Sequence, residues 1–207
     1  MKDDTQKQQK RSFTVPVLLI IIVTLAILCI LFYSKQLLSQ QVDKTDEGKA
    51  LAQKYAYAQS YADLLRGGAK QMLDATSEAD RMRAKELLGE ARFAFAASVS
   101  LFVEALIRQT GLPDEQAMAS LAPMTTALGG AESVLNTVGE HEGPLTDAEK
   151  AALSAAVDAG TKAGAALSKY HAPTGDGAYR IMADGGEWID AALQAKLELE
   201  ALAKNVS

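Results

Sequence analysis

The chain has 207 residues, a formal net charge of −5 and 37 alanines. Hydrophobic residues make up 48% of it and are unevenly spread, because the 19 residues from position 15 to 33 carry no charge. A fully soluble cytosolic protein is therefore not expected, and the negative charge argues against nucleic acid as a partner, which requires a basic surface.

The uncharged segment 15–33 has the length of a membrane span. As a helix it would be roughly 28 Å long, close to the ~30 Å hydrocarbon core of a bilayer. Four basic residues precede the segment: Lys2, Lys7, Lys10 and Arg11. They favour a cytoplasmic N-terminus, although Lys35 on the other side opposes that bias. We predict a short cytoplasmic tail at 1–14, a transmembrane signal anchor at 15–33, and a single-pass cell-membrane protein with its C-terminal part extracytoplasmic.

Two alternatives to an uncleaved anchor are a cleaved signal peptide and a lipoprotein signal. The apolar run is longer than the 7–15 residues typical of a signal peptide, and no small-x-small cleavage site follows it. Cys29 is preceded by Leu28, which is larger than the small residue expected before a lipidated cysteine. We therefore expect Cys29 to be a small apolar residue that faces lipid or a partner helix.

Residues 34–207 contain 17 Lys and Arg, 24 Asp and Glu, and no cysteine. Without disulfides, the stability of this part depends on helix packing. Its acidic balance also argues against electrostatic adhesion to anionic lipid. We predict a juxtamembrane stalk at 34–45 and an extracytoplasmic helical-bundle domain at 46–207. Whether the membrane helix continues through the stalk stays open.

Apolar and small residues recur with the helical period throughout this domain. The first predicted helix, 46–75, has a 4-3 stripe along one face; it consists of Leu51, Tyr55, Ala58, Ala62, Leu65, Ala69 and Met72. Thr76 or Ser77 caps the second helix, which ends at Gly111. The third begins near Asp114 and should kink or split near Ala122, because Pro123 lies inside it. Its predicted 4-3 stripe consists of Ala117, Leu121, Met124, Leu128, Ala131, Leu135 and Val138.

The residues Thr146 and Glu149 form a capping box that begins a fourth helix, expected to end near Tyr170. A fifth helix should bury a stripe that includes Ile181 and Trp188, with Gly185 inside the helix. Short loops favour antiparallel neighbours, so the predicted fold is all-α: a single transmembrane helix followed by an antiparallel up-and-down bundle of about five helices.

Small residues at the helix seams indicate close packing. The spacing of Ala156, Gly160 and Gly164 is read in this way, because the surrounding sequence is too polar for a membrane dimerisation motif. The Gly-Gly pairs 67–68, 129–130 and 185–186 indicate close packing or local kinks, with an ancient duplicated hairpin as the weaker interpretation.

The densest group of polar and aromatic residues lies between positions 170 and 188. We identify it as a candidate ligand or partner site; the residues are His171, Asp176, Tyr179, Arg180 and Trp188. The alternative is an ordinary turn followed by a helix that buries Trp188 and Ile181. A second feature is the stretch 109–149, which has seven acids and no Lys or Arg. We interpret it first as an ordinary solvated surface; the alternatives are complementary helix faces within the bundle and an acidic surface for a basic partner.

No pattern indicates catalysis, a metal or a cofactor. His141 and His171 are 30 residues apart in separate loops, and His141 with Glu142 reads as a solvated loop. Asp176 lies in a glycine-rich loop that lacks the alternating oxygen ligands of a calcium site. A nucleophile elbow and a phosphate-binding loop are also missing.

The leading functional hypothesis is a non-catalytic module that binds another protein in the envelope or takes part in its assembly. The second is a ligand-sensing ectodomain that signals through a partner protein. Its helix pattern broadly resembles the helical-bundle sensor domains of bacterial receptors, although no second membrane span or output domain is expected. An envelope enzyme is the third, and self-association through stalk and anchor stays open.

Overall fold

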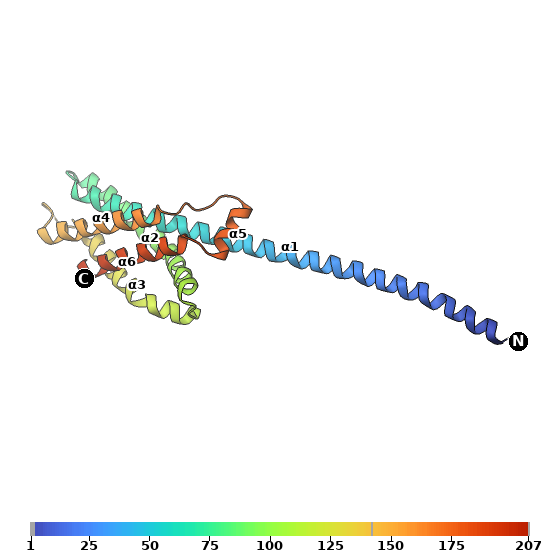
Figure 1. Cartoon of the computed structure of the whole chain (residues 1–207). Coiled ribbons are helices and arrows are strands. Elements are labelled where there is room, and N and C mark those ends of the chain that lie inside the picture. Colours follow the sequence, from blue (N-terminus) through green and yellow to red (C-terminus); the bar gives the residue numbers. More distant parts are fainter. Residues whose placement is uncertain (1–2, 142, 207) are drawn as a thin grey trace. The chain divides into compact units, whose positions relative to one another are not determined.

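The computed structural model describes residues 3–141 and 143–206, with side chains for residues 15–141 and 143–204. The described residues form six helices and no strand, so the all-α prediction is confirmed (Figure 1). The chain divides into two compact units, residues 1–44 and residues 45–207.

The longest helix, α1 (Asp3–Leu73), has 71 residues. Its apolar segment has a mean hydropathy of 3.3 over 18 residues, and none of that segment is buried. Within the described part of the chain, α1 is the one helix long and apolar enough to cross a membrane. The helix continues without a break through the predicted stalk at 34–45, so this stretch is helical.

In the unit 45–207, α1 supplies one wall of the hydrophobic core. All seven residues of its predicted 4-3 stripe are buried, which confirms that the stripe faces other helices. The buried hydroxyl of Tyr55 donates to the carbonyl of Leu167, with 2.6 Å between the oxygens. The ring of Tyr61 lies against Phe95, with 5.0 Å between the ring centres.

The second helix, α2 (Glu78–Thr110), begins and ends where the sequence predicts. The Ser77 hydroxyl accepts from the backbone of Asp80, whose carboxylate accepts in return from the backbone of Ser77. Gly111 ends the helix in the left-handed conformation, with φ at 71°, and its N–H donates to the carbonyl of Ile107. A glycine is favoured there because a Cβ would strain this conformation.

The third helix, α3 (Asp114–Thr137), runs unbroken through Pro123, so the predicted split does not occur. Proline removes one hydrogen bond to the carbonyl four residues earlier, at Ala119. Both residues lie on the exposed side of the helix, where water can satisfy that carbonyl. The seven predicted core residues on the other face, from Ala117 to Val138, are all buried.

The fourth helix, α4 (Asp147–Leu167), starts with the predicted capping box of Thr146 and Glu149. It ends three residues before the expected end at Tyr170. A Cβ added to Gly160 would lie 2.8 Å from the carbonyl oxygen of Ala62 and 2.9 Å from the backbone N of Arg66. The expectation that Gly160 serves close helix packing is therefore confirmed.

The single fifth helix of the prediction is wrong, because two helices occupy its place: α5 (Asp176–Asp184) and α6 (Trp188–Val206). Gly185 and Gly186 separate them, with φ values of 123° and 122° that no helix contains. Ile181 is consequently 72% exposed instead of buried. Because the helix stops at this glycine pair, the orientation of α6 does not follow from that of α5. The 4-3 spacing across the break therefore does not predict a common buried face.

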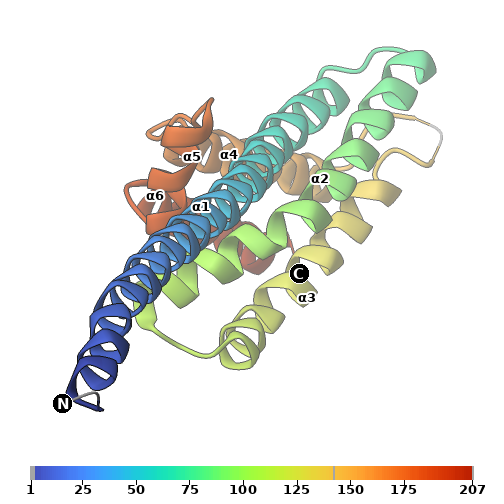
Figure 2. The ribbon, with the colours of Figure 1, turned by 90° about the vertical axis from the view of Figure 1, so that its right-hand side faces the viewer.

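Buried residues from all six helices form one hydrophobic cluster. Helix α4 lies along α6 (Figure 1), and α2 lies beside α3 (Figure 2). Many of the buried positions are alanines, which let helices approach closely; examples are Ala58, Ala62, Ala105, Ala156, Ala163, Ala192 and Ala195.

Candidate functional site

The five candidate site residues fall on the loop before α5, on α5 itself and at the start of α6. His171 and Asp176 are exposed, and Tyr179 and Arg180 are half-buried. Trp188 is fully buried. The side chains are therefore divided between solvent and core.

Tyr179 and Arg180 hold α5 against α1. A guanidinium nitrogen of Arg180 donates to the hydroxyl of Thr45 at 3.2 Å. The backbone of Tyr179 lies so close to Gly48 that a Cβ there would be 1.9 Å from the Tyr179 carbonyl oxygen. These two residues position α5, and glycine at 48 is what permits the contact.

Trp188 lies in the core at the start of α6. Its indole N–H donates to the carbonyl of Met182 at 3.0 Å, which satisfies the only polar atom of the ring. The guanidinium of Arg108 lies 5.8 Å from the ring centre, in the range of a cation–π contact. The expectation that Trp188 is buried is therefore confirmed.

Arg108 connects four segments at this end of the domain. It donates to the carbonyl of Ala183 and to the carboxylate of Glu47, and its Nε lies 3.8 Å from the carboxylate of Glu104. It thus joins α2 to α1 and to the end of α5, and it covers Trp188. Sequence reasoning missed Arg108, because a basic residue near a helix end normally reads as a complement to the helix dipole.

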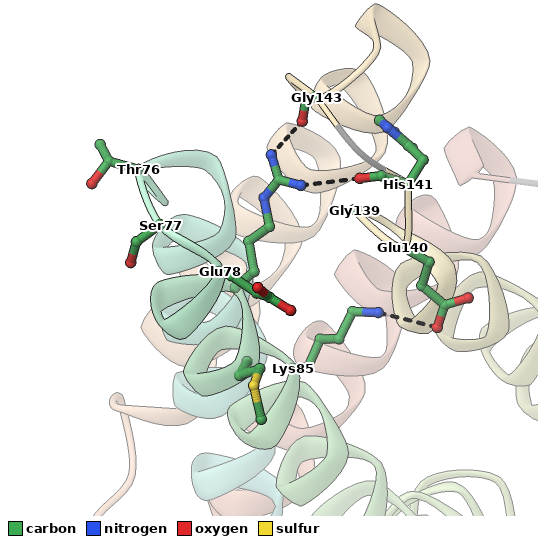
Figure 3. Close-up of a pocket in the computed structure, with 10 residues that line it drawn as sticks. Thr76, Ser77, Glu78, Lys85, Gly139, Glu140, His141 and Gly143 are labelled. Carbon is green, nitrogen blue, oxygen red and sulfur yellow. Dashed lines mark hydrogen bonds and ion pairs between the residues drawn. The ribbon is translucent and has the colours of Figure 1, made fainter.

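A cleft of about 720 Å³ lies elsewhere, between the start of α2 and the loop after α3 (Figure 3). Arg81 donates from both terminal nitrogens to the carbonyls of His141 and Gly143. Lys85 pairs with Glu140 at 3.1 Å. Both cations are therefore engaged by the loop itself, and none of the five candidate residues lines this cleft.

Glu149 holds the same loop from the other side. Its carboxylate accepts from the backbone N–H groups of Gly139 and Thr146 and from the Thr146 hydroxyl, and it lies 2.8 Å from the His141 ring. Burial raises the pKa of Glu149, but these hydrogen bonds outweigh it and lower the pKa to about 2. The capping box is thus part of a larger clamp on residues 139–146, whereas Glu142 lies outside the described residues.

Three acids of the stretch 109–149 contact other residues of the domain. Glu140 pairs with Lys85 of α2, Glu149 holds the loop, and Asp147 lies 3.8 Å from Lys150. Of these contacts, the Glu140–Lys85 pair joins the stretch to another helix, as the complementary-faces interpretation requires. Asp147 and Lys150 lie on the same helix and do not bear on that interpretation. Asp114 and Glu115 at the start of α3 are exposed.

Comparison with known proteins finds no matching family model, no matching curated protein and no matching solved structure. Among the described residues, no group of three or more His, Cys, Asp or Glu is placed to hold a metal ion.

Proposed function

We propose that the protein is a membrane-anchored, extracytoplasmic helical-bundle module that binds an envelope protein and has no catalytic role. The observation that carries this proposal is the composition of α1. Its apolar segment at 15–33 is exposed, whereas Leu51, Leu65 and Met72 of the same helix are core residues. A helix able to anchor in a membrane is therefore also an integral part of the folded domain.

The proposed architecture of residues 46–207 is an antiparallel up-and-down bundle. The connections between α1 and α2, at 74–77, and between α2 and α3, at 111–113, are short. Short connections favour antiparallel neighbours. Helix α6 contacts α2, α3 and α4, as expected of a helix inside a bundle.

The proposed partner surface consists of the exposed loop before α5 and the first residue of that helix, Asp176. His171 and Asp176 are exposed, while the residues around them are fixed: Tyr170 packs edge-on against Tyr55, with ring centres 5.3 Å apart, and Arg180 bonds Thr45. Exposed polar groups on a loop with fixed ends are suited to specific binding, because less ordering is required when the partner docks.

A photo-crosslinking amino acid introduced into the full chain in native membranes tests this surface. Substitution at His171 or Asp176 should give one reproducible protein adduct. The same substitution at Arg83, which is exposed on α2, is the matched control and should not give that adduct. Identical adducts from all three positions would refute a specific surface at this loop.

The proposed topology places the N-terminus in the cytoplasm and residues beyond 34 outside. Protease added to intact cells should then digest the C-terminal domain. Full protection in intact cells, with digestion only after lysis, would show the opposite orientation.

A second candidate function is ligand sensing with output through a partner. The contact of Tyr179 and Arg180 with residues 45–48 of α1 favours this function. A ligand bound by α5 would change the contact of α5 with α1, the helix that contains the proposed anchor. A ligand that binds only the native state raises its stability. A screen of small molecules by thermal shift should therefore find a specific ligand, whose effect is lost in R180A.

A further inference from the structure

Two buried polar atoms belong to residues that line a small cavity where α1, α2 and α3 meet. Tyr61 of α1 is 1% exposed, and Glu132 of α3 buries its Oε1 atom. Neither the Tyr61 hydroxyl nor this oxygen has a hydrogen-bond partner among the described residues. The cavity measures about 10 Å³. Its lining consists of Tyr61, Leu65, Leu88, Ala91, Glu132, Leu135 and Asn136.

A buried polar group without a partner is costly, because it has given up its hydrogen bonds to water. The Tyr61 hydroxyl is a donor here, since burial raises its pKa, with the nearby Glu132 carboxyl raising it further. Burial also raises the pKa of Glu132, while Arg92 opposes this effect. A donor and an acceptor thus belong to residues of one cavity, whose other lining residues are apolar except for Asn136.

We propose that this cavity is a binding site for one ordered water molecule. The water accepts a hydrogen bond from the Tyr61 hydroxyl and donates one to Glu132 Oε1, with the Asn136 side chain available as a third partner. The cavity has about the volume that a single water requires, and buried waters make two to four hydrogen bonds. A metal cation is not favoured, because Ca²⁺ and Mg²⁺ need about six oxygen ligands.

The variant Y61F tests the proposal in the full chain, purified in detergent. It removes the hydroxyl and keeps the ring that packs against Phe95. If water bridges the two groups, the loss of one hydrogen bond should lower the melting temperature by roughly 2–4 °C. If the cavity is dry, removing an unpaired hydroxyl should raise it instead.

Two further variants serve as controls. Tyr57→Phe makes the same change at a partly exposed site on the same helix and should leave the melting temperature unchanged. Glu132→Gln keeps a side-chain oxygen as acceptor, so it should shift the melting temperature less than Glu132→Leu does.

A crystal structure of the full chain provides the direct readout. Electron density for a water within hydrogen-bond distance of both Tyr61 Oη and Glu132 Oε1 is the expected result. An empty cavity, a direct hydrogen bond between the two side chains, or a melting temperature of Y61F equal to or above that of the wild type would overturn the proposal.

Discussion

At the scale of single residues, the contact between α4 and α1 depends on the absence of a side chain at position 160. The added Cβ would meet backbone atoms of α1, at Ala62 and Arg66, which cannot move aside as a flexible side chain can. By contrast, a Cβ at Gly164 would lie 3.8 Å from the nearest atom, the Cβ of Ala62, which is ordinary contact.

The pair of variants G160A and G164A measures this difference. G160A should lower the free energy of unfolding by about 1–3 kcal/mol, because overpacking pushes the helices apart. G164A should be neutral or stabilising by up to about 1 kcal/mol, since alanine favours helix more than glycine does. Denaturant titration followed by circular dichroism is the measurement, and equal effects of the two substitutions would argue against close packing at Gly160.

The Glu149 clamp makes stability depend on acid. Its pKa in the folded protein, about 2, lies below its ordinary value of 4.5. The stabilisation is therefore complete above about pH 5 and is lost as the pH falls toward 2. E149Q should lower the free energy of unfolding by about 1–2 kcal/mol at neutral pH, because a neutral amide accepts weaker hydrogen bonds than a carboxylate. The variant should also lose less stability than the wild type as the pH falls. Melting temperatures of wild type and E149Q across this pH range provide the check.

At the scale of elements, the break between α5 and α6 depends on the backbone of Gly185. Its φ of 123° with ψ of −156° is a conformation that is essentially restricted to glycine. G185A should therefore destabilise the domain by about 1–3 kcal/mol. The control is G177A within α5, where the nearest atom to an added Cβ is 4.0 Å away, at the end of the Arg180 side chain. A larger loss from G177A would contradict this account.

Sequence periodicity predicted most of the helices but not this break. Every residue of the predicted stripes on α1 and α3 is buried. Ser77 and Thr146 cap α2 and α4 through hydrogen bonds of their side chains. The break escaped prediction because the 4-3 spacing of Ile181, Gly185 and Trp188 happens to continue across it. The pairs Gly67–Gly68 and Gly129–Gly130 lie inside continuous helices. A glycine pair alone therefore does not show whether a helix continues or breaks.

The candidate site was predictable only in part. Composition located a dense polar and aromatic segment, and His171 and Asp176 are indeed exposed within it. The role of Tyr179 and Arg180 depends on Gly48 and Thr45, which are more than 130 residues earlier in the chain. Contacts over such a separation leave no periodic signal in a single sequence.

At the scale of the whole molecule, the domain begins inside α1. The buried positions of α1 from Leu51 to Met72 belong to the same hydrophobic cluster as those of the other five helices. We predict that a fragment of residues 45–207 is folded and melts cooperatively. A fragment of residues 76–207 should lack cooperative melting and expose apolar surface, because a wall of the core is missing. Thermal circular dichroism and dye binding distinguish the two, and cooperative melting of the shorter fragment would contradict this assignment.

The burial of Trp188 has a practical consequence. It is the only tryptophan in the chain, so intrinsic fluorescence excited at the indole band comes from a single, known place. The ring is shielded from water, its N–H donates a hydrogen bond to the carbonyl of Met182, and the guanidinium of Arg108 covers it. Emission should therefore be blue-shifted in the native protein and move to the red when the junction of α2, α5 and α6 opens. Trp188 fluorescence therefore reports on the region where the C-terminal helices α5 and α6 pack near α1.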